Sequence, residues 1–420
     1  VQMPLTEEDK QRIESENERM AGNALRVLGA AYACVADDDT KVDVQDDLIW
    51  LGLLGMADPI RTGVQDVIST FHQAGIDTVM ITGDQSPTAY AIAKELNLSR
   101  NGPLEILDST QLAPIDPEVL QALATRVHVF ARVSPAHKLQ IVQALQHASE
   151  VVAMTGDGIN DGPALKAADI GIAMGHSGTD VAREVADVIL EDDNLETMII
   201  AVGEGRRIYD NIRKSIHFLL STNLSEILVM FSVTAAGLGQ PLNTMQLLWI
   251  NLISDIAPAL ALALEPPEPD VLRRPPRRPD EPIIRSSDLK KIALESTVLS
   301  AGALGAYGYG MMRYGMGPQP STITFMSLTA GQLLHAISCR SVTHSVFGAE
   351  SLPPNRYLDL ALLGSLAVQV LALVVPGLRG LLGIAPIDLL DSLVIGSSAL
   401  FPLVVNEAAK SLSVRHVSAR

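Results

Sequence analysis

The chain has 420 residues, of which 47% are hydrophobic, and this length predicts two or three domains. Its 48 acidic residues outnumber its 31 basic residues, which argues against nucleic acid as a partner. The charge is concentrated before Ser215 and the apolar residues after it, so we expect a protein with two parts. Cys34 and Cys339 lie far apart in the sequence, and no disulfide framework is expected.

The first chemical pattern follows a predicted strand at 77–81, Asp-Thr-Val-Met-Ile. Thr82, Gly83 and Asp84 come directly after this strand and place a hydroxyl and a glycine where phosphate oxygens would need donors. Thr-Gly-Asp alone is a weak signal, so its meaning depends on the segments that follow it.

A helix is predicted to begin at Ser134 or Pro135, which places Lys138 in its first turn. A lysine at such a position is usually a solvated surface residue. Its alternative use is as a cation that stabilises the charge on a transferring phosphoryl group.

The most informative segment is 154–163, Met-Thr-Gly-Asp-Gly-Ile-Asn-Asp-Gly-Pro, which lies between a predicted buried strand at 150–154 and a predicted helix. Ligands of open α/β sheets bind at the carboxyl ends of strands, and the glycines let the backbone approach a phosphate closely. Asp157 can bind Mg²⁺ as a hard oxygen ligand. Asn160 and Asp161 would fix the loop and the phosphate geometry.

Together these three segments resemble the phosphorylation domain of P-type ATPases, a branch of the haloacid dehalogenase superfamily. Asp58-Pro-Ile-Arg61 departs from the family's Asp-Pro-Pro-Arg at Ile60, and Gly162 stands where many relatives have alanine. The resemblance implies ATP as substrate and Mg²⁺ as cofactor. It also implies that the phosphoryl group, nucleotide and metal ion are bound by a set of residues at these strand ends: Thr82, Gly83 and Asp84; Arg132 and Lys138; Asp157 and Asp161 for Mg²⁺; and Asn160 to complete the pocket.

The family's nucleophile, the aspartate of an Asp-Lys-Thr-Gly-Thr motif, is not in this sequence. Covalent catalysis needs that carboxylate to take the γ-phosphoryl group, so we expect this chain alone not to hydrolyse ATP. The resemblance divides the chain into the end of a nucleotide-binding domain with a connector (1–48), the carboxyl-terminal part of a phosphorylation domain (49–204) and a transmembrane domain (205–420). The expected partner is the missing amino-terminal half of the same pump.

Six apolar stretches of about 20 residues are long enough to cross a bilayer, and they lie at 216–238, 244–264, 292–312, 323–342, 358–376 and 388–407. Several are rich in Gly, Ser and Ala, as expected where membrane helices pack closely. The alternative is a buried helical core of a soluble protein. The expected fold class is a partial Rossmann-like α/β domain of the haloacid dehalogenase type, followed by an all-α bundle of six transmembrane helices.

Lys and Arg accumulate in the segments on one side of these predicted spans, whereas the other side holds only Arg313 and Arg379. Because such residues accumulate in cytoplasmic loops, the soluble part and both ends of this half are expected in the cytosol.

Polar residues inside the first two predicted spans are candidates for transport chemistry, since a carboxylate in a membrane helix is costly. Asn223 and Glu226 stand three apart, and Asn251 and Asp255 stand four apart, so each pair shares a helix face. The alternative is that these polar groups only hydrogen-bond the helices together.

Pro258 removes the N–H that would otherwise bond the carbonyl of Ser254, so we expect the helix to break at that level. The freed carbonyls would add hard oxygen ligands. A set of carboxylate, amide, hydroxyl and carbonyl oxygens suits a hard cation such as Ca²⁺, Na⁺ or K⁺, and tells against a heavy-metal pump.

Ser221-Thr-Asn-Leu-Ser-Glu226 and Leu247-Leu-Trp-Ile-Asn-Leu-Ile-Ser-Asp255 resemble the fifth and sixth membrane helices of the calcium-pump-like subclass. Ser254 stands where calcium pumps of the reticulum carry Thr, and Gln332, in the fourth predicted span, stands where they carry Glu. The resemblance implies that the transported cation is bound by Asn223, Glu226, Asn251, Ser254, Asp255 and Gln332.

Three functional classes compete on this evidence: half of an ATP-driven cation pump, a membrane-tethered phosphatase, and a catalytically dead membrane protein that binds ions or a partner. We expect the first, with Ca²⁺ as cargo and with Na⁺, K⁺ and Mn²⁺ as alternatives. The protein is then expected to be a multi-pass integral protein of the plasma membrane, in contact with the lipid bilayer.

Overall fold

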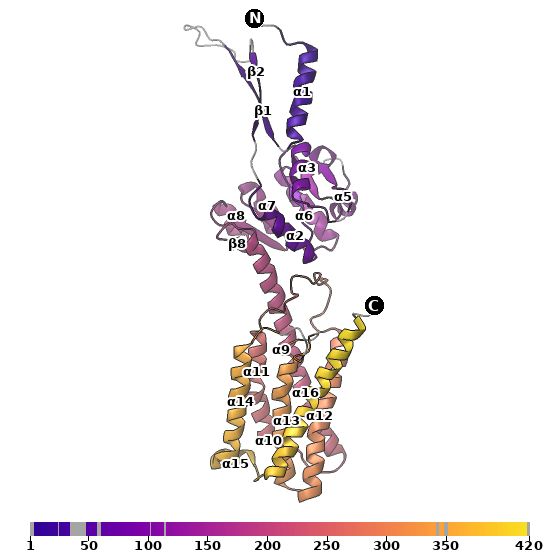
Figure 1. The fold of residues 1–420 in the computed structure, drawn as a ribbon, viewed down its shortest axis with the longest axis vertical. Coiled ribbons are helices and arrows are strands. Elements are labelled where there is room, and N and C mark those ends of the chain that lie inside the picture. Colours follow the sequence, from indigo (N-terminus) through magenta and orange to yellow (C-terminus); the bar gives the residue numbers. More distant parts are fainter. Residues whose placement is uncertain are drawn as a thin grey trace. The chain divides into compact units, whose positions relative to one another are not determined.

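The computed structural model describes residues 4–23, 25–33, 48–56, 60–100, 102–112, 115–341, 344–347 and 352–417. Cys34, Asp58 and Pro59 lie outside these ranges. The chain divides into two compact units (Figure 1). Unit 1 comprises Val1–Val202 and Leu272–Pro279, and unit 2 comprises Gly203–Val271 and Asp280–Arg420.

Unit 1 is an α/β unit in which an antiparallel strand pair precedes two parallel sheets. A helix, α1 (Glu7–Ala21), comes before the antiparallel pair β1 (Arg26–Tyr32) and β2 (Ile49–Met56). The two parallel sheets have the orders β3-β5-β4 and β6-β7-β8. Their strands are β3 (Met80–Ile81), β4 (Ile106–Asp108), β5 (Val129–Ala131), β6 (Ala153–Gly156), β7 (Ile170–Met174) and β8 (Val188–Leu190).

Short helices connect these parallel strands, as the parallel topology requires. They are α2 (Val64–Gln73), α3 (Ser86–Glu95), α4 (Ser109–Leu112), α5 (Pro117–Ala124), α6 (Pro135–His147), a 3₁₀ turn η1 (Ile159–Asp161), α7 (Gly162–Ala167) and α8 (Asp180–Val185).

The strand predicted at 150–154 begins later than expected, at Ala153. The reason is local, because the Val152 N–H donates to the Asp169 side chain at 2.8 Å instead of joining a strand ladder. The helix predicted from Ser134 or Pro135 is confirmed. The Ser134 side chain caps α6 by accepting from the His137 N–H. Pro135 occupies the first turn, where a backbone N–H would have no partner within the helix.

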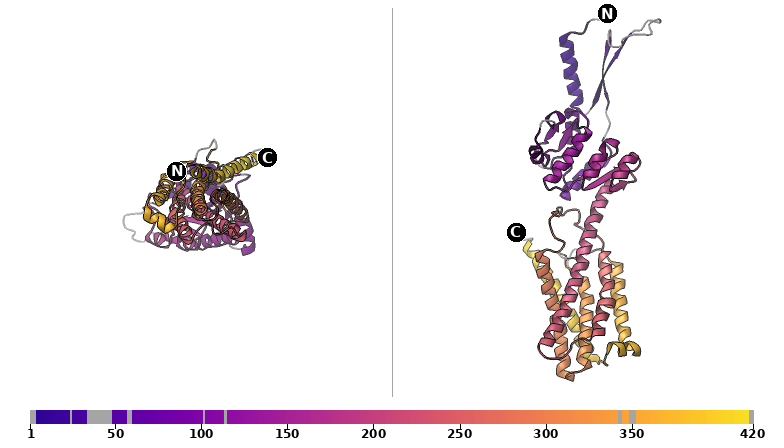
Figure 2. Two further views of the ribbon diagram at one scale, coloured as in Figure 1. Left: turned by 90° about the horizontal axis from the view of Figure 1, so that it is seen from below. Right: turned by 180° about the vertical axis from the view of Figure 1, so that it is seen from behind.

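Unit 2 is all-helical, and its long helices run alongside one another (Figures 1 and 2). Its elements are α9 (Glu196–Ala235, which starts within unit 1), α10 (Thr244–Trp249), a π turn η2 (Ile250–Ser254), α11 (Ile256–Ala263), α12 (Ser286–Tyr314), α13 (Pro318–Ser338), α14 (Arg356–Val374), α15 (Pro376–Leu382) and α16 (Leu389–Val417).

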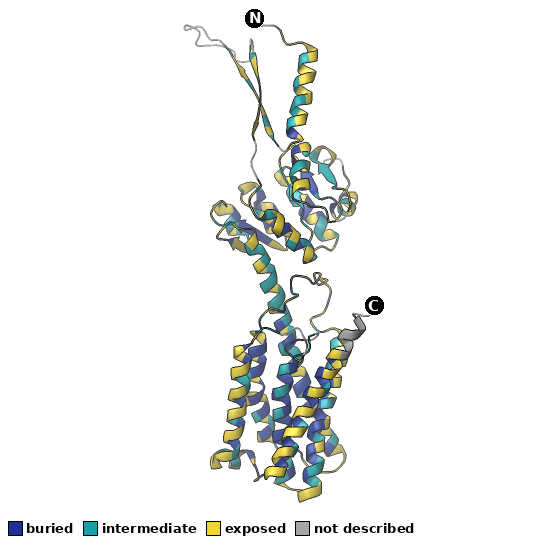
Figure 3. Ribbon diagram, viewed as in Figure 1, coloured by how far each residue is buried: buried dark blue, intermediate teal, exposed yellow. Residues whose placement is uncertain are grey.

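The prediction of six membrane spans is wrong in number. Four segments among the described residues are long and apolar enough to cross a membrane: Glu196–Ala235, Thr244–Ala263, Arg356–Val374 and Leu389–Ser411. The two that do not qualify are α12 and α13. Figure 3 shows α13 largely buried, and it packs against α12 and α16, so its many hydroxyl-bearing side chains face protein. A helix with little outward surface needs fewer apolar side chains, whereas the sequence interpretation counted every apolar stretch of about 20 residues as a span.

Glycine allows α12 and α16 to approach closely. A Cβ added at Gly302 would lie 2.7 Å from the Ser398 carbonyl oxygen, whereas a Cβ at Gly305 on the same helix would meet nothing within 4 Å. Small residues that bring backbones together are typical of membrane helix interfaces.

We therefore expect Gly302→Ala to destabilise the protein by about 1–3 kcal/mol through overpacking. Gly305→Ala should be neutral or slightly stabilising, because alanine favours a helix over glycine. Thermal unfolding of the full-length protein in detergent, followed by circular dichroism, measures both. Equal melting temperatures for the two variants would show that this close contact does not hold the helices together.

Candidate functional site

The first candidate site is built from the ends of parallel strands in unit 1. The Thr82 N–H donates to the Phe130 carbonyl at 2.9 Å, and the Thr82 carbonyl accepts from the Val133 N–H at 3.0 Å. The Thr82 hydroxyl donates to the Asp84 carboxylate at 3.0 Å and accepts from the Asp84 N–H at 3.1 Å. Two predicted segments, 82–84 and 130–138, are thus joined by backbone bonds.

Arg132 lies in this junction in an unusual backbone conformation. Its φ angle is +54°, in the left-handed region that side chains other than glycine rarely adopt. Its N–H donates to the Asp84 carbonyl at 2.9 Å, and its side chain is exposed. Residues in strained conformations cluster at functional sites, so this is an independent reason to place one here.

Lys138 and Asp161 form the central ion pair of this site. The Lys138 Nζ lies 2.5 Å from Asp161 Oδ1, with side chains 19% and 8% exposed. The other carboxylate oxygen of Asp161 accepts from the Gly158 N–H at 3.2 Å. A Cβ at Gly156 would lie 2.5 Å from the Asp161 Cβ, so the strand end must be glycine for the pair to form. Lys138 is therefore a positioned cation and not a solvated surface lysine.

Asp157 and Asn160 are both exposed on the same loop, and the Asp157 carbonyl accepts from the Thr179 N–H at 2.8 Å. Their side-chain oxygens are accessible, whereas the carboxylate of Asp161 is held by Lys138. Hard, accessible oxygens fit Mg²⁺, which keeps several of its waters and needs few protein ligands. Asp157 and Asn160 fit that ion directly.

The second candidate site is a buried polar cluster in unit 2, which we call the carboxylate cluster: Thr222 and Glu226 on α9, Asn251 and Asp255 at the π turn, and Gln332 on α13. The Glu226 carboxylate accepts from the Asn251 amide at 3.0 Å and from the Gln332 amide at 3.1 Å. The Thr222 hydroxyl donates to Asp255 Oδ2 at 3.0 Å. Three separate helical segments thus meet at two carboxylates.

Oxygen atoms in this cluster are available for a ligand. Asp255 Oδ1 and Gln332 Oε1 are buried and find no hydrogen-bond partner among the described residues. Buried polar atoms are nearly always bonded, so such exceptions call for an explanation, and an ion is one of the usual ones. Glu226 and Asp255 are 5% and 1% exposed.

A π turn brings the second helix into the cluster. The Asp255 N–H donates to the Ile250 carbonyl at 3.0 Å, five residues back, so the helix widens over Ile250–Ser254. Ser254 is buried on this turn. The irregularity lies at the level predicted from Pro258, but Pro258 itself falls within α11. Single π turns in helices are frequent at functional sites.

The structure does not bring Asn223 into the carboxylate cluster. Its amide donates to the Leu219 carbonyl of its own helix at 2.7 Å. Thr222 takes part instead, and the sequence interpretation missed it. The signal was available, because Thr222 and Glu226 are four residues apart and therefore lie on one helix face.

These features define a haloacid dehalogenase-like unit followed by a membrane-helix unit with a buried carboxylate cluster. The family of haloacid dehalogenase-like hydrolases matches residues 4–169, and the family described as the C-terminus of cation-transporting ATPases matches residues 239–412. The chain belongs to the P-type cation-transporting ATPases and is similar to their calcium-transporting members. The family predicted from the sequence motifs is confirmed.

The relatives that support this assignment are calcium-transporting ATPases. A "Calcium-transporting ATPase 1" of Bacillus cereus is 40% identical over 423 residues, covering 97% of this chain and 47% of the relative. A calcium-transporting ATPase of Bacillus subtilis is 41% identical over 94% of this chain and 45% of its own length. The human "Calcium-transporting ATPase type 2C member 1" is 38% identical over 93% of this chain and 41% of its own length. The chain spans about half the length of the curated relatives it matches.

We expect Lys138→Met to destabilise the protein on the order of 2 kcal/mol, because it leaves the buried Asp161 carboxylate without its cation. Adding Asp161→Asn should recover part of this loss. The coupling energy comes from thermal unfolding of the two single variants and the double variant.

Lys166→Met is the matched control, because Lys166 is exposed on the neighbouring helix α7. A Lys138→Met variant as stable as this control would mean that the ion pair contributes nothing to the folded state.

Proposed function

We propose that this chain is the carboxyl-terminal part of an ATP-driven pump that moves Ca²⁺ across a membrane through an aspartyl-phosphate intermediate. The carboxylate cluster is the observation that carries the proposal. Elsewhere in unit 2, buried carboxylates are paired with cations: Glu268 with Lys214 at 2.7 Å, Glu265 with Arg340 at 2.8 Å, and Glu407 with Lys410 at 2.7 Å. The hydrogen bonds described for Glu226 and Asp255 come from neutral amides and a hydroxyl.

The donor chemistry supports Ca²⁺ as cargo. Two carboxylates match the charge of one divalent ion, and the amide and hydroxyl oxygens nearby are hard ligands of the kind Ca²⁺ takes in sets of six to eight. The cluster offers no sulfur or imidazole, which Cu⁺ and Zn²⁺ prefer. The named activity of the relatives agrees with this choice.

The strand-end site of unit 1 would handle the phosphoryl group. Thr82, Gly83 and Asp84 form the turn that would hold it, and Lys138 would neutralise its charge. Asp157 and Asn160 would hold Mg²⁺, which supplies charge stabilisation when bound, and Asp161 on the same loop would reach the ion only by sharing its carboxylate with Lys138. Arg132 projects from the same strand end and would contact the nucleotide.

The edges of the two parallel sheets support a partner segment that completes this site. Within the described residues, β3 and β6 are edge strands of different sheets, yet Ile81 of β3 packs against the apolar cluster around Met154 of β6. Two edge strands that pack on the same apolar cluster but do not hydrogen-bond to each other present backbone N–H and C=O groups that an added strand can pair with. We propose that a strand carrying the aspartate nucleophile, from the amino-terminal part of the pump, occupies this place. Residues 1–48 would then be the end of the nucleotide-binding domain.

The distribution of charge supports one orientation. Four candidate spans bring both ends of unit 2 to the same side, and Lys and Arg accumulate on that side. We propose that this side, with unit 1, is cytosolic. The plasma membrane stays our prediction for its location, which membrane fractionation tests.

We expect the full-length protein in membranes to form a hydroxylamine-sensitive phosphoprotein from radiolabelled ATP only when Ca²⁺ is present. Glu226→Gln and Asp255→Asn should each raise the Ca²⁺ concentration needed for half-maximal phosphoprotein more than about tenfold, because each removes a charged ligand. Asp359→Asn, an exposed carboxylate at the start of α14, is the matched control.

Phosphoprotein that depends on Mn²⁺, Na⁺ or K⁺ instead would reassign the cargo. No phosphoprotein with any of these ions would reject the pump and favour a membrane protein that only binds ions.

The chain passes from unit 1 to unit 2 within helix α9, so we expect this helix to couple phosphorylation to ion binding. Loosening it at the exposed positions Ile208 and Ile212 with glycine costs about 1 kcal/mol per site relative to alanine. The double glycine variant should keep Ca²⁺ binding and lose Ca²⁺-stimulated turnover.

The double alanine variant at the same positions is the control. Both positions are exposed, so neither substitution removes a buried ion pair of α9 such as that of Lys214 with Glu268. Full Ca²⁺-stimulated turnover in the double glycine variant would contradict coupling through α9.

A further inference from the structure

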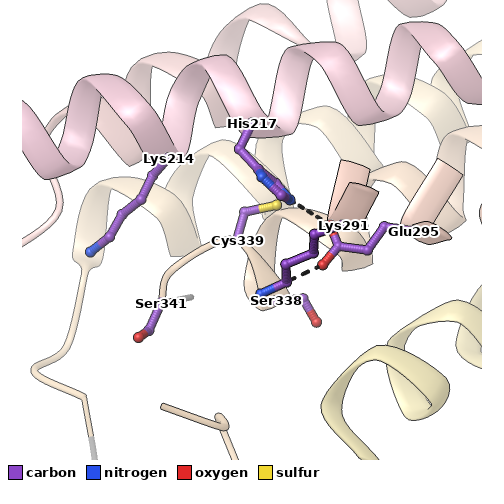
Figure 4. A pocket seen from close by; sticks show the side chains of 7 residues that line it. All are labelled: Lys214, His217, Lys291, Glu295, Ser338, Cys339 and Ser341. Carbon is purple, nitrogen blue, oxygen red and sulfur yellow. Dashed lines mark hydrogen bonds and ion pairs between the residues drawn. The ribbon is translucent and has the colours of Figure 1, made fainter. Parts of the chain in front are cut away.

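A second buried cluster in unit 2 has donor chemistry unlike that of the carboxylate cluster. It consists of His217 on α9, Glu295 on α12, and His335 and Cys339 at the end of α13 (Figure 4 shows three of them). His217 Nε2 lies 2.5 Å from Glu295 Oε2, and His335 Nε2 lies 3.6 Å from the same oxygen. The Cys339 sulfur lies 3.4 Å from His335 Nε2. We call these four residues the His–Cys cluster.

We propose that the His–Cys cluster is a binding site for a transition metal ion of the Zn²⁺ type. One donor atom from each of His217, His335 and Cys339 lies within 4.8 Å of the other two. Zinc takes four ligands from thiolate, imidazole and carboxylate groups. This group of three offers one thiolate and two imidazoles, and the Glu295 carboxylate contacts both histidines from a third helix.

Two of the donor-to-donor distances match those of a tetrahedral site. Bonds of about 2.0–2.3 Å place zinc ligands roughly 3.3–3.8 Å from one another. The separations from His335 Nε2 to Cys339 Sγ and to Glu295 Oε2, 3.4 and 3.6 Å, already fall in this range. The His217–Glu295 contact, at 2.5 Å, would have to open for both groups to bind one ion. A cavity of about 10 Å³, close to the space that one water molecule needs, is lined by His217, Glu295 and Cys339, and His335 lies behind this lining.

An outer contact can orient the buried histidine. The Asn406 side-chain amide lies 3.4 Å from His335 Nδ1. Metal binding at Nε2 requires the proton on Nδ1, and the amide oxygen of Asn406 can accept that proton when the amide is turned by 180°. His335 Nε2 would exchange its present contact with the Ser221 hydroxyl, at 2.9 Å, for the metal ion.

The charges around the cluster come from two lysines and one carboxylate, and the cysteine can add one more negative charge. Lys214 and Lys291 line the same cavity, and Figure 4 shows both beside the cluster. Lys214 is held by Glu268 at 2.7 Å, and Lys291 Nζ lies 3.9 Å from Glu295 Oε1. A bound metal displaces the thiol proton of Cys339, so thiolate and carboxylate would supply two negative charges, with Lys291 beside the carboxylate.

Cobalt substitution tests this site without reference to pump activity. The full-length protein in detergent is stripped with a chelator and titrated with Co²⁺. We expect a single Co²⁺ per chain with a near-ultraviolet thiolate-to-cobalt band and the visible bands of tetrahedral coordination, all lost on adding Zn²⁺. Zn²⁺ should also raise the melting temperature, since it binds only the folded state.

The variants identify the ligands. Cys339→Ser should remove the thiolate band and weaken Co²⁺ binding more than about tenfold, since loss of even an outer-shell partner costs that much. Cys34→Ser, which removes the chain's other cysteine, is the matched control and should leave the spectrum unchanged. His217→Asn, at the rim of the cluster with its side chain 13% exposed, should weaken binding and keep the thiolate band. The His217→Asn variant tests the site if Cys339→Ser does not fold.

Three results would overturn the proposal: no thiolate band in the folded wild type, a band that persists in Cys339→Ser, or a band lost in Cys34→Ser. Glu226→Gln should keep the cobalt spectrum, so failure of the metal site and failure of the calcium site are distinguishable.

Discussion

The burial of two carboxylates among neutral donors is the constraint on which unit 2 depends. Glu226 and Asp255 are withdrawn from water, and their described bonds come from Asn251, Gln332 and Thr222. Neutral donors offset part of the cost of removing a charge from water, but they do not cancel two negative charges that face each other. The two carboxylates are stabilised when protons or a cation are bound to them, so the free energy of this part of the bundle depends on whether the site is occupied. A pump needs a site whose surroundings respond to its ligand in this way.

This constraint explains several departures from regular helix packing. The π turn at Ile250–Ser254 widens the second helix where Asn251 and Asp255, already on one helix face, meet Glu226 and Thr222. Gln332 reaches Glu226 because α13 is buried among other helices. The same burial lets α13 carry Thr and Ser at many positions. Some donate to a carbonyl one turn back, as Thr324 and Thr329 do, and others bond side chains of neighbouring elements, as Ser338 does with Glu407.

The sequence allowed prediction of the segments of the strand-end site, and much less of how they contact one another. The motifs placed Thr82, Lys138 and Asp157 at strand ends, and parallel sheets bring such ends to one edge. Lys138 bonds Asp161, whereas Asp157 stays exposed. The Lys138–Asp161 pair depends on the close approach of Asp161 to Gly156, which the sequence did not predict. In unit 2, hydropathy identified the helical segments but not which of them face protein, so the number of membrane spans was overestimated. Asn223 was assigned by resemblance, although its amide bonds its own helix.

The His–Cys cluster was not predicted from the sequence, because only His335 and Cys339 are close in the chain, four residues apart at the end of α13, whereas His217 and Glu295 come from two other helices. Its position relative to the carboxylate cluster carries a physical consequence. Gln332 and His335 are three residues apart on α13, and their partners Thr222 and Ser221 are adjacent on α9. Two sites one helical turn apart would compete for any ion that both could bind. Their donors prevent this, because hard oxygens select Ca²⁺ and imidazole with thiolate selects Zn²⁺. An ion in the second site would join α9, α12 and α13 beside the first, so its occupancy would restrain the same helices whose arrangement the carboxylates depend on.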